Sequence, residues 1–311
     1  MSIAILVATK NRPDKLNKLL ESLTPSAHNI NQIVIISSGQ NISQVVADFK
    51  DSLNIKHLHS KVSGQITQKI EGIKYIDERN SWVLFLDDDI TISKEAIDTL
   101  INKYLKNPNF INVNGFGLKI NNLEFRKYTK AQIMFMRVFG LYSDKSGSVL
   151  ESGHAQTYQN SLEDIETEWL NGISAWRAES LRSYSSRFPE INYAAYEDVI
   201  YSYRISRKNR LLFASSVSVV NQDLEIYTPL TIAQYKAGSY MRYLFVSENK
   251  NLSKSNLLIA QLFRTIDFTL NGDLSISKAK RFAKTFLIWW DLCLAILIKT
   301  DPIKLLNKRY S

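Results

Sequence analysis

Three adjacent carboxylates at the end of an apolar run are the residues of this chain best suited to chemistry. Asp87, Asp88 and Asp89 directly follow the apolar stretch 82–86. Such a run, between polar neighbours, is typical of a short, fully buried strand. Like charges this close raise one another's proton affinity unless a cation neutralises them. Either the three side chains are solvated at a strand-to-helix turn, with Ser93 capping the next helix, or they hold a metal ion.

The expected geometry of these acids favours a divalent cation. Side chains two apart in a strand share a face, so we expect Asp87 and Asp89 together and Asp88 opposite. Mg²⁺ and Mn²⁺ prefer oxygen ligands, and Mg²⁺ is commonly held by one or two carboxylates plus substrate phosphates. A calcium loop is excluded, because Ile92 stands where its sharp turn needs Gly and Asp98 where it needs Glu.

A second pair of acids, Glu197 and Asp198, begins a predicted helix. Two carboxylates near a cleft can supply a general base, provided that one lies within hydrogen-bond reach of the proton it takes. Acids in the first turn of a helix also complement its dipole without any catalytic role. Spacing alone leaves both interpretations open.

The elements that position these groups alternate between strand and helix. Apolar runs near 2–8, 32–37, 55–59 and 82–86 are each followed by a helical pattern, the first opened by Pro13. This alternation predicts a mainly parallel sheet with helices on both faces, whose ligands bind beyond the carboxyl ends of the strands. No Gly-rich phosphate loop is present, so hydride-transfer and P-loop functions have no support. The edge collects polar residues: Thr9, Asn11, Arg12, Ser37, Ser38, Gly64, Gln65 and Asp87–Asp89.

Beyond residue 107 the pattern becomes less regular. Residues 121–152 are polar and irregular apart from an apolar centre at 133–141. A short helix is expected after Arg177, another that starts near 193–200 and ends in the basic run 204–210, and a last strand over 211–220. A long and partly irregular second half of this kind is typical of a substrate-specific part joined to a nucleotide-binding part.

Composition narrows the class of protein further. The 311 residues carry a net charge of +9, which predicts an anionic partner. The single Cys293 excludes an internal disulfide and a multi-cysteine zinc site, and fits a reducing cytoplasm. The four histidines have no metal-ligand spacing, and the start of the chain has no basic leader, so we expect no secretion signal. No nucleic-acid module surrounds the basic run 204–210, so we expect no nucleic-acid partner.

The tail is helical and basic, with predicted helices over 229–245, 257–270 and 282–298. The last contains Trp289 and Trp290, but Asp291 interrupts it and it is short for a membrane-spanning helix. Flanking lysines and paired tryptophans are typical of a helix lying on an anionic membrane surface. A helix packed on the catalytic domain, or a subunit contact, explains the same pattern.

Taken together, these pieces resemble the family 2 glycosyltransferases, which have a GT-A fold. The resemblance covers about residues 2–222, and its pieces stand in the expected order. It implies a nucleotide-sugar donor, a divalent cation (Mn²⁺ or Mg²⁺), inversion at the anomeric carbon, and a glycan or lipid-linked acceptor in bacterial surface polysaccharide synthesis. The matching pieces are 8–13, Ser38-Gly39, 64–72, 84–89, 169–172 with Arg177, and 196–199 with Arg204.

The resemblance also implies roles for individual residues. Asp198 matches the catalytic base, with Glu197 as the alternative, and Asp89 the direct metal ligand, with Asp87 linked to ribose or metal. Trp169, Asn171 and Gly172 match the wall between donor sugar and acceptor. The implied donor contacts are Thr9, Asn11, Arg12, Ser38, Gln65, Lys69, Asp87 and Asp88.

Two departures from the family pattern affect specificity and metal binding. Ser37 and Ser38 stand where many members have an Asp that reads the base. Asn221 stands near the place of a His that is an additional metal ligand in many members.

We therefore expect a GT-A catalytic domain over 1–225 and a helical basic tail over 226–311. Within the domain, 1–107 is the nucleotide half and 108–225 the acceptor half. The expected location is cytoplasmic, peripheral on the inner face of the cell membrane. The alternatives are a nucleotidyltransferase that makes sugar nucleotides, and a non-catalytic protein that binds membranes or polyanions.

Overall fold

The computed structural model describes residues 3–61, 64–123, 128–182, 195–223, 230–272, 275–301, 304–305 and 308. They form two compact units, neither continuous in sequence. The first unit comprises Met1–Leu123, Tyr158–Phe188 and Tyr201–Glu225, and the second Glu124–Thr157, Pro189–Ile200 and Ile226–Ser311. These units are defined by packing, so the functional division at residue 225 stays a prediction.

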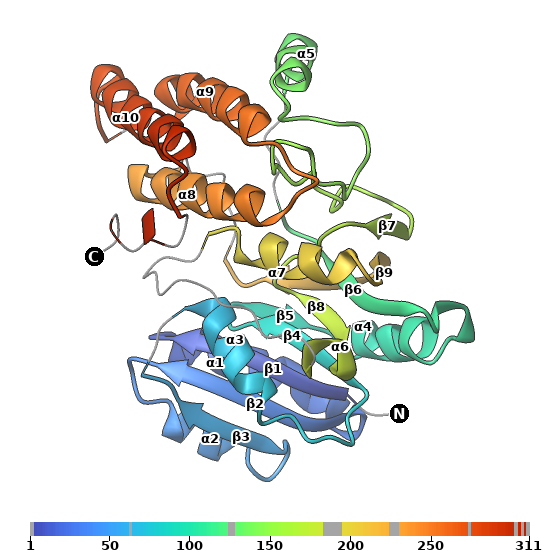
Figure 1. Ribbon diagram of the computed structural model, residues 1–311. Helices are drawn as coiled ribbons and strands as arrows, with labels where there is room; N and C mark the ends of the chain where they lie inside the picture. Colours follow the sequence, from blue (N-terminus) through green and yellow to red (C-terminus); the bar gives the residue numbers. More distant parts are fainter. Residues whose placement is uncertain are drawn as a thin grey trace. The chain divides into compact units, whose positions relative to one another are not determined.

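The first unit begins with the predicted alternation of strands and helices (Figure 1). Its first four strands lie in the order β3-β2-β1-β4, all parallel. Pro13 opens the first helix, where its missing N–H costs no hydrogen bond. The elements are β1 (Ile3–Lys10), α1 (Pro13–Leu23), β2 (Ile30–Ser38), α2 (Ser43–Asp48), β3 (Ile55–His59), α3 (Gln65–Ile73) and β4 (Trp82–Asp87).

The sheet continues from β4 through β8, β6, β9 and β5, and β7 pairs with β9. β8 is antiparallel to both of its neighbours, whereas β6 and β9 are parallel. Ser93 caps α4 by accepting a hydrogen bond from the Ala96 N–H, as expected. The further elements are β5 (Ile90–Ile92), α4 (Lys94–Thr99), the π-helix Leu100–Leu105, β6 (Val113–Ile120), β7 (Ile165–Thr167), β8 (Ser174–Arg177), α6 (Ala178–Arg182), α7 (Glu197–Ser206) and β9 (Arg210–Asn221).

Both faces of this sheet are buried, which explains the continuous apolar runs of its central strands. Ile5 and Val7 of β1 pack on one face with Leu16 of α1. Ala4 and Leu6 pack on the other face, in the core that also holds Ile73 of α3. The predicted α/β sheet with helices on both faces is confirmed.

One local expectation at the acidic triplet is wrong. β4 ends at Asp87, and Asp88 and Asp89 form a turn before β5. Strand alternation therefore does not extend past Asp87. Asp88 and Asp89, which alternation would put on opposite faces, both accept hydrogen bonds from Arg12.

The second unit contains the helices α5 (Lys130–Val138), α8 (Ile232–Glu248), α9 (Lys254–Asn271) and α10 (Lys278–Leu297), and its described residues 139–157 are irregular. The three predicted tail helices are confirmed; the first begins slightly later than expected, because Thr231 and Gln234 form a capping box. The apolar centre at 133–141, expected in an irregular segment, is largely α5, with Met134, Phe135 and Val138 exposed. In the described part of the chain, no helix has the length and apolar character needed to span a membrane.

Candidate nucleotide and metal site

The parallel register brings the polar ends of β1 and β4 together. Ala8 lies opposite Asp87 in this pair, so the loop after β1 begins beside the acidic triplet. The carboxyl ends of parallel strands are where ligands of such sheets bind.

Asp88 is the most buried of the three acids, at 5% exposure. Its Oδ2 accepts a hydrogen bond of 2.6 Å from Thr9 Oγ1, and its Oδ1 one of 3.2 Å from Arg12 Nη1. Burial raises the pKa of Asp88, although Thr9 and Arg12 act in the opposite direction. Asp88 therefore ties the loop after β1 to the end of β4, and its two oxygens are already engaged.

Asp87 lies at the centre of a second group of contacts. Lys69 Nζ donates to Asp87 Oδ1 at 2.8 Å and to the Gly172 carbonyl at 2.9 Å, and Gln65 Nε2 also donates to Asp87 Oδ1. The Lys69 side chain is only 2% exposed. A Cβ at Gly172 would lie 3.2 Å from Asp87 Oδ2, so a glycine allows this close approach. Four residues predicted as site residues thus meet here.

The acids retain the oxygens that a divalent cation would need. Arg12 Nη1 donates to Asp89 Oδ2 at 2.8 Å, and no described residue donates to Asp89 Oδ1 or to Asp87 Oδ2. Both carboxylates are about a quarter exposed, at 24% and 26%. No cluster of three or more His, Cys, Asp or Glu side chains suited to a metal occurs among the described residues. The donor set therefore fits a cation that takes two carboxylate oxygens and completes its shell with phosphate and water.

The end of β9 adjoins the triplet through contacts that the sequence did not predict. Asn221 pairs with Ile90 in the antiparallel ladder. The next residue, Gln222, donates its backbone N–H to the Asp89 carbonyl at 2.7 Å and its side chain to the Lys15 and Ile90 carbonyls, each at 3.0 Å. Gln222 therefore fixes the turn that carries Asp89.

Asn11 and Ser38 lie at the same edge, on the loops after β1 and β2. Asn11 adopts a φ of 57°, and its Oδ1 accepts the Gln40 N–H at 2.8 Å. A Cβ at Gly39 would lie 2.1 Å from that Oδ1, which explains the glycine there. Ser38 is 5% exposed, and its Oγ is buried without a partner.

The predicted wall residues are held by an aromatic side chain that sequence reasoning missed. The Asn171 N–H donates to Tyr158 Oη at 2.6 Å, and the Trp169 ring centroid lies 4.9 Å from that of Tyr158. Tyr158 is fully buried. Its position in an irregular, polar segment gave no periodic signal.

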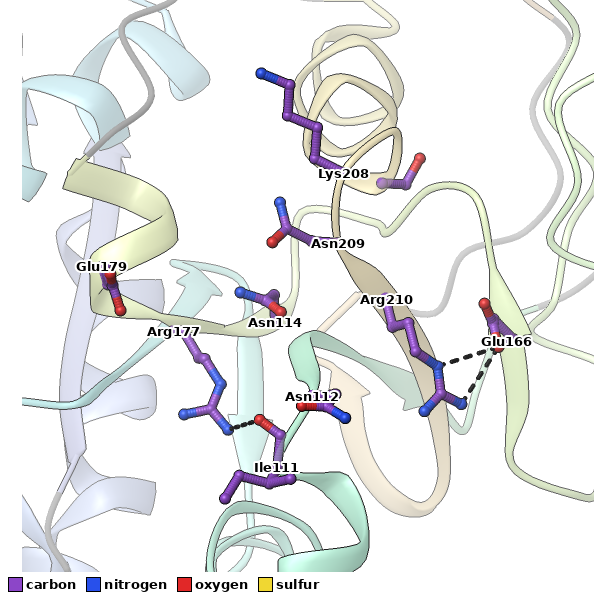
Figure 2. Close-up of a pocket in the computed structure, with 10 residues that line it drawn as sticks. Ile111, Asn112, Asn114, Glu166, Arg177, Glu179, Lys208, Asn209 and Arg210 are labelled. Carbon is purple, nitrogen blue, oxygen red and sulfur yellow. Dashed lines mark hydrogen bonds and ion pairs between the residues drawn. The ribbon is translucent and has the colours of Figure 1, made fainter.

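Arg177 lies at the opposite end of β4, in register with Trp82. Its guanidinium donates to the Val113 carbonyl at 2.9 Å and to the Ile111 carbonyl at 2.7 Å, and so holds the start of β6. It lines a polar cavity of about 630 Å³ that Figure 2 shows, together with the ion pair of Arg210 and Glu166. None of the predicted catalytic, donor or metal residues lines this cavity.

The candidate base pair begins α7, in the part that belongs to the second unit. Glu197 is 7% exposed, and Asp198 Oδ1 accepts the Val199 N–H at 2.8 Å. Tyr196, just before them, adopts a φ of 71°, which is unusual for a residue with a side chain. Its Oη accepts the Ala155 N–H at 2.7 Å and donates to the Gly153 carbonyl. Tyr193 and Ala194, where a helix start was expected, lie outside the described residues.

Comparison with solved structures defines the class of fold. Residues 1–349 of TarS from S. aureus match with a TM-score of 0.56 and 15% identity, over 94% of this chain and 81% of that one. The same protein in complex with UDP-GlcNAc gives 0.54 and 17%, with the same coverage. GalNAc-T7, crystallised with UDP, GalNAc and Mn²⁺, gives 0.54 and 14%, over 78% of this chain and 48% of that one. At these identities the likeness establishes the fold, which is the GT-A fold.

The family follows from the sequence. The model of glycosyl transferase family 2 matches residues 4–164, and the chain belongs to this family. No curated protein matches the chain significantly. Family membership makes the protein a glycosyltransferase and decides against the nucleotidyltransferase and non-catalytic alternatives.

Proposed function

We propose that this protein transfers a sugar, with inversion, from a nucleoside-diphosphate sugar to a hydroxyl of a glycan or lipid-linked glycan in cell-envelope polysaccharide synthesis. One observation carries the proposal. Asp87 and Asp89 each keep one carboxylate oxygen without a described partner, at the carboxyl edge of the sheet and beside the cationic Arg12 and Lys69. Solved structures of the same fold crystallised with UDP or UDP-GlcNAc support the donor class.

On the donor side, the protein positions positive charge where the reaction develops negative charge. The departing nucleoside diphosphate gains charge as the bond to the sugar breaks, and preorganised cations stabilise it. Arg12 and Lys69 are held in place by the acids, so they need little reorganisation for this task. A divalent cation held by Asp87 and Asp89 would add Lewis-acid stabilisation of the same group.

On the acceptor side, a hydroxyl with a high pKa needs a base as it attacks. We assign this role to Asp198, which lies in the first turn of α7 and is less buried than Glu197. A single displacement by the hydroxyl inverts the anomeric carbon and requires no covalent enzyme intermediate.

Replacing Asp198 tests the proposed base. Asp198→Asn should lower the rate of sugar transfer by about 10²–10⁴-fold, the usual contribution of a general base. Binding of the nucleotide should persist, because the donor site lies on residues of the first unit. Glu197→Gln serves as the matched variant and should retain more activity than Asp198→Asn. An Asp198→Asn protein with normal transfer would place the base elsewhere.

We further propose that α10 lies on an anionic membrane surface and so meets a lipid-linked acceptor. Its exposed apolar residues include Leu287 at 65%, Trp290 at 50% and Leu297 at 75%. At 3.6 residues per turn they fall opposite the buried face formed by Ile288, Leu292 and Ala295. Exposed lysines at 280 and 284 supply charge complementary to anionic lipid.

Vesicle binding tests this surface. Trp290→Glu should weaken co-sedimentation with vesicles containing phosphatidylglycerol by about tenfold or more, because it replaces an inserted ring with a repelled charge. Leu162→Glu, at a residue that is 86% exposed in the first unit, should leave sedimentation unchanged. Equal binding by the two variants would remove α10 from the membrane contact.

A further inference from the structure

Two guanidinium groups and one imidazole gather in the second unit, and no described residue supplies them with an acidic partner. Arg242 lies on α8 and Arg264 on α9, and His154 lies in the loop after Gly153. Arg242 is 7% exposed and His154 9%. Neither arginine forms an ion pair with a carboxylate in the described part of the chain. Buried charges are normally paired, because an unpaired ion loses its hydration without compensation.

The electrostatics confirm that these groups affect one another as like charges. Burial, and then Arg264, lower the pKa of Arg242 to about 10. Burial, followed by Arg242 and Arg264, holds the pKa of His154 well below its usual value. The guanidinium of Arg242 lies 4.3 Å from the Tyr196 ring centroid, and that of Arg264 lies 5.3 Å from the Tyr235 centroid. Ring faces offset only part of the cost of burying these charges.

Four buried polar atoms in this region have no hydrogen-bond partner among the residues that the structure describes: Arg242 Nε, Arg264 Nη1, His154 Nε2 and Gln261 Oε1. Such atoms are rare in folded proteins and call for an explanation. The first two are donors. Gln261 uses its amide nitrogen on Tyr235 Oη at 2.6 Å and Ser239 Oγ at 2.8 Å, which leaves its carbonyl oxygen as an acceptor.

The tautomer of His154 follows from its neighbour. Ser152 Oγ donates to the Gly140 carbonyl, so it accepts from His154 Nδ1, which lies 3.1 Å away. The neutral ring then carries its proton on Nδ1, and Nε2 presents a lone pair. The cluster therefore offers cationic donors and uncharged acceptors together. An oxyanion that keeps one proton complements this combination, because its anionic oxygens accept from the guanidinium groups and its O–H group donates to an acceptor.

We propose that Arg242, Arg264 and His154 bind a hydrogen-phosphate group, either as the free ion or as a phosphate monoester. The anionic oxygens accept from Arg242 Nε and Arg264 Nη1, and the P–OH group donates to His154 Nε2. Charge-assisted hydrogen bonds to arginine are strong, and phosphate is a frequent partner of paired guanidinium groups. Sulfate carries no proton near neutral pH and cannot make the third contact.

This site adjoins the candidate base within the second unit. Arg242 packs on Tyr196, which directly precedes Glu197 and Asp198. A phosphate bound here lies beside the start of α7, so the group belongs to a phosphorylated acceptor or to a free phosphate that acts on this helix. The acceptor assignment rests on the proposed function, whereas binding of the ion does not.

Thermal unfolding of the full chain in inorganic phosphate, at pH 7 and constant ionic strength, tests the site. Phosphate should raise Tm with saturation, because a ligand of the native state stabilises it by mass action, and sulfate should need about tenfold higher concentration or more. Arg264→Gln should abolish the phosphate-dependent shift. Arg79→Gln, at an arginine of the first unit whose side chain is 83% exposed, is the matched control and should keep it. This experiment contains neither donor nor acceptor, so its result does not depend on whether the protein transfers a sugar.

Two further measurements test the site: the stability of Arg264→Gln without phosphate, and the Tm shifts caused by other anions. Without phosphate, Arg264→Gln should melt no lower than the wild type, because it removes a like charge and Arg264 makes no hydrogen bond to a described residue. Methyl phosphate should shift Tm as phosphate does if the group is esterified, and phosphate alone should do so if the ion is free. A dimethyl phosphate or sulfate shift equal to that of phosphate would overturn the site, as would a full shift in Arg264→Gln.

Discussion

The two charged clusters of this protein differ in how their buried charges are balanced. In the first unit, the carboxylates of Asp87–Asp89 are met by Thr9, Arg12 and Lys69 at 2.6–3.2 Å. In the second unit, Arg242 and Arg264 have ring faces beside them and no carboxylate from the described residues. The acid cluster has two cations beside its three carboxylates before any ligand arrives, whereas the cation cluster has no carboxylate beside it among the described residues. A ligand adds to contacts that are already in place at the first cluster, and it supplies the missing counter-charge at the second.

The largest effect should come from removing internal neutralisation at the acid cluster. Lys69→Met should lower the free energy of unfolding by about 2–3 kcal/mol, below the full cost of breaking a buried pair, because Asp87 stays partly exposed. Urea denaturation measures the loss. Lys69→Met should also weaken nucleotide binding, because Asp87 and Gly172 lose the cation that joins them.

A surface ion pair supplies the control for Lys69. Lys94→Met breaks the contact of Lys94 with Asp98 on α4, at 2.6 Å and in solvent. Exposed pairs contribute little, so this variant should unfold like the wild type. Equal losses in the two variants would show that the pair of Lys69 and Asp87 contributes no more than an exposed ion pair.

A smaller effect should appear in the pH dependence of the second unit. The pKa of His154 is depressed in the folded state, so below its ordinary value of 6.5 the unfolded chain binds a proton that the folded chain does not. Stability is therefore present above pH 6.5 and is lost as the pH falls, by up to about 1.4 kcal/mol per pH unit.

Comparing variants isolates this contribution. His154→Asn should flatten the dependence between pH 6.5 and pH 5, whereas His28→Asn, at an exposed residue, should keep the wild-type slope. Asp88 contributes to stability with the opposite pH dependence. Because its pKa is raised in the folded state, its contribution is present at low pH and is lost as the pH rises. An unchanged slope in His154→Asn would mean that the imidazole is hydrated in the folded protein.

The sequence predicted the features that hydrophobic periodicity or a position at the end of a strand determines. The four parallel strands, Pro13 at the start of α1 and Ser93 as a cap were readable, because burial on both faces and capping chemistry leave local patterns. The strand pattern also placed Gln65 and Asp87 at the same edge of the sheet, whereas Lys69 and Gly172 entered only through the family resemblance, since no local pattern links residues so far apart.

Other features depend on tertiary contacts that no short pattern encodes. β8 enters the sheet antiparallel between two strands from elsewhere in the chain, and Tyr158 supports the predicted wall from an irregular segment. Nor could it be anticipated that Arg242 has no carboxylate partner among the described residues, because its place among Tyr196, His154 and Arg264 arises only when distant segments pack. Sequence alternation also misplaced Asp88 and Asp89, because the strand ends at Asp87, two residues before Asp89.

The most direct test of the central claim is calorimetric titration with UDP, GDP, ADP and dTDP, with and without Mn²⁺, in wild type and Asp89→Asn. Asp98→Asn, on the surface of α4, serves as the control. At least one nucleotide should bind the wild type and the control about tenfold more tightly with Mn²⁺, and Asp89→Asn should lose this gain. Nucleotide binding that ignores Mn²⁺, or a gain that persists in Asp89→Asn, would contradict a metal–diphosphate site at the acidic triplet.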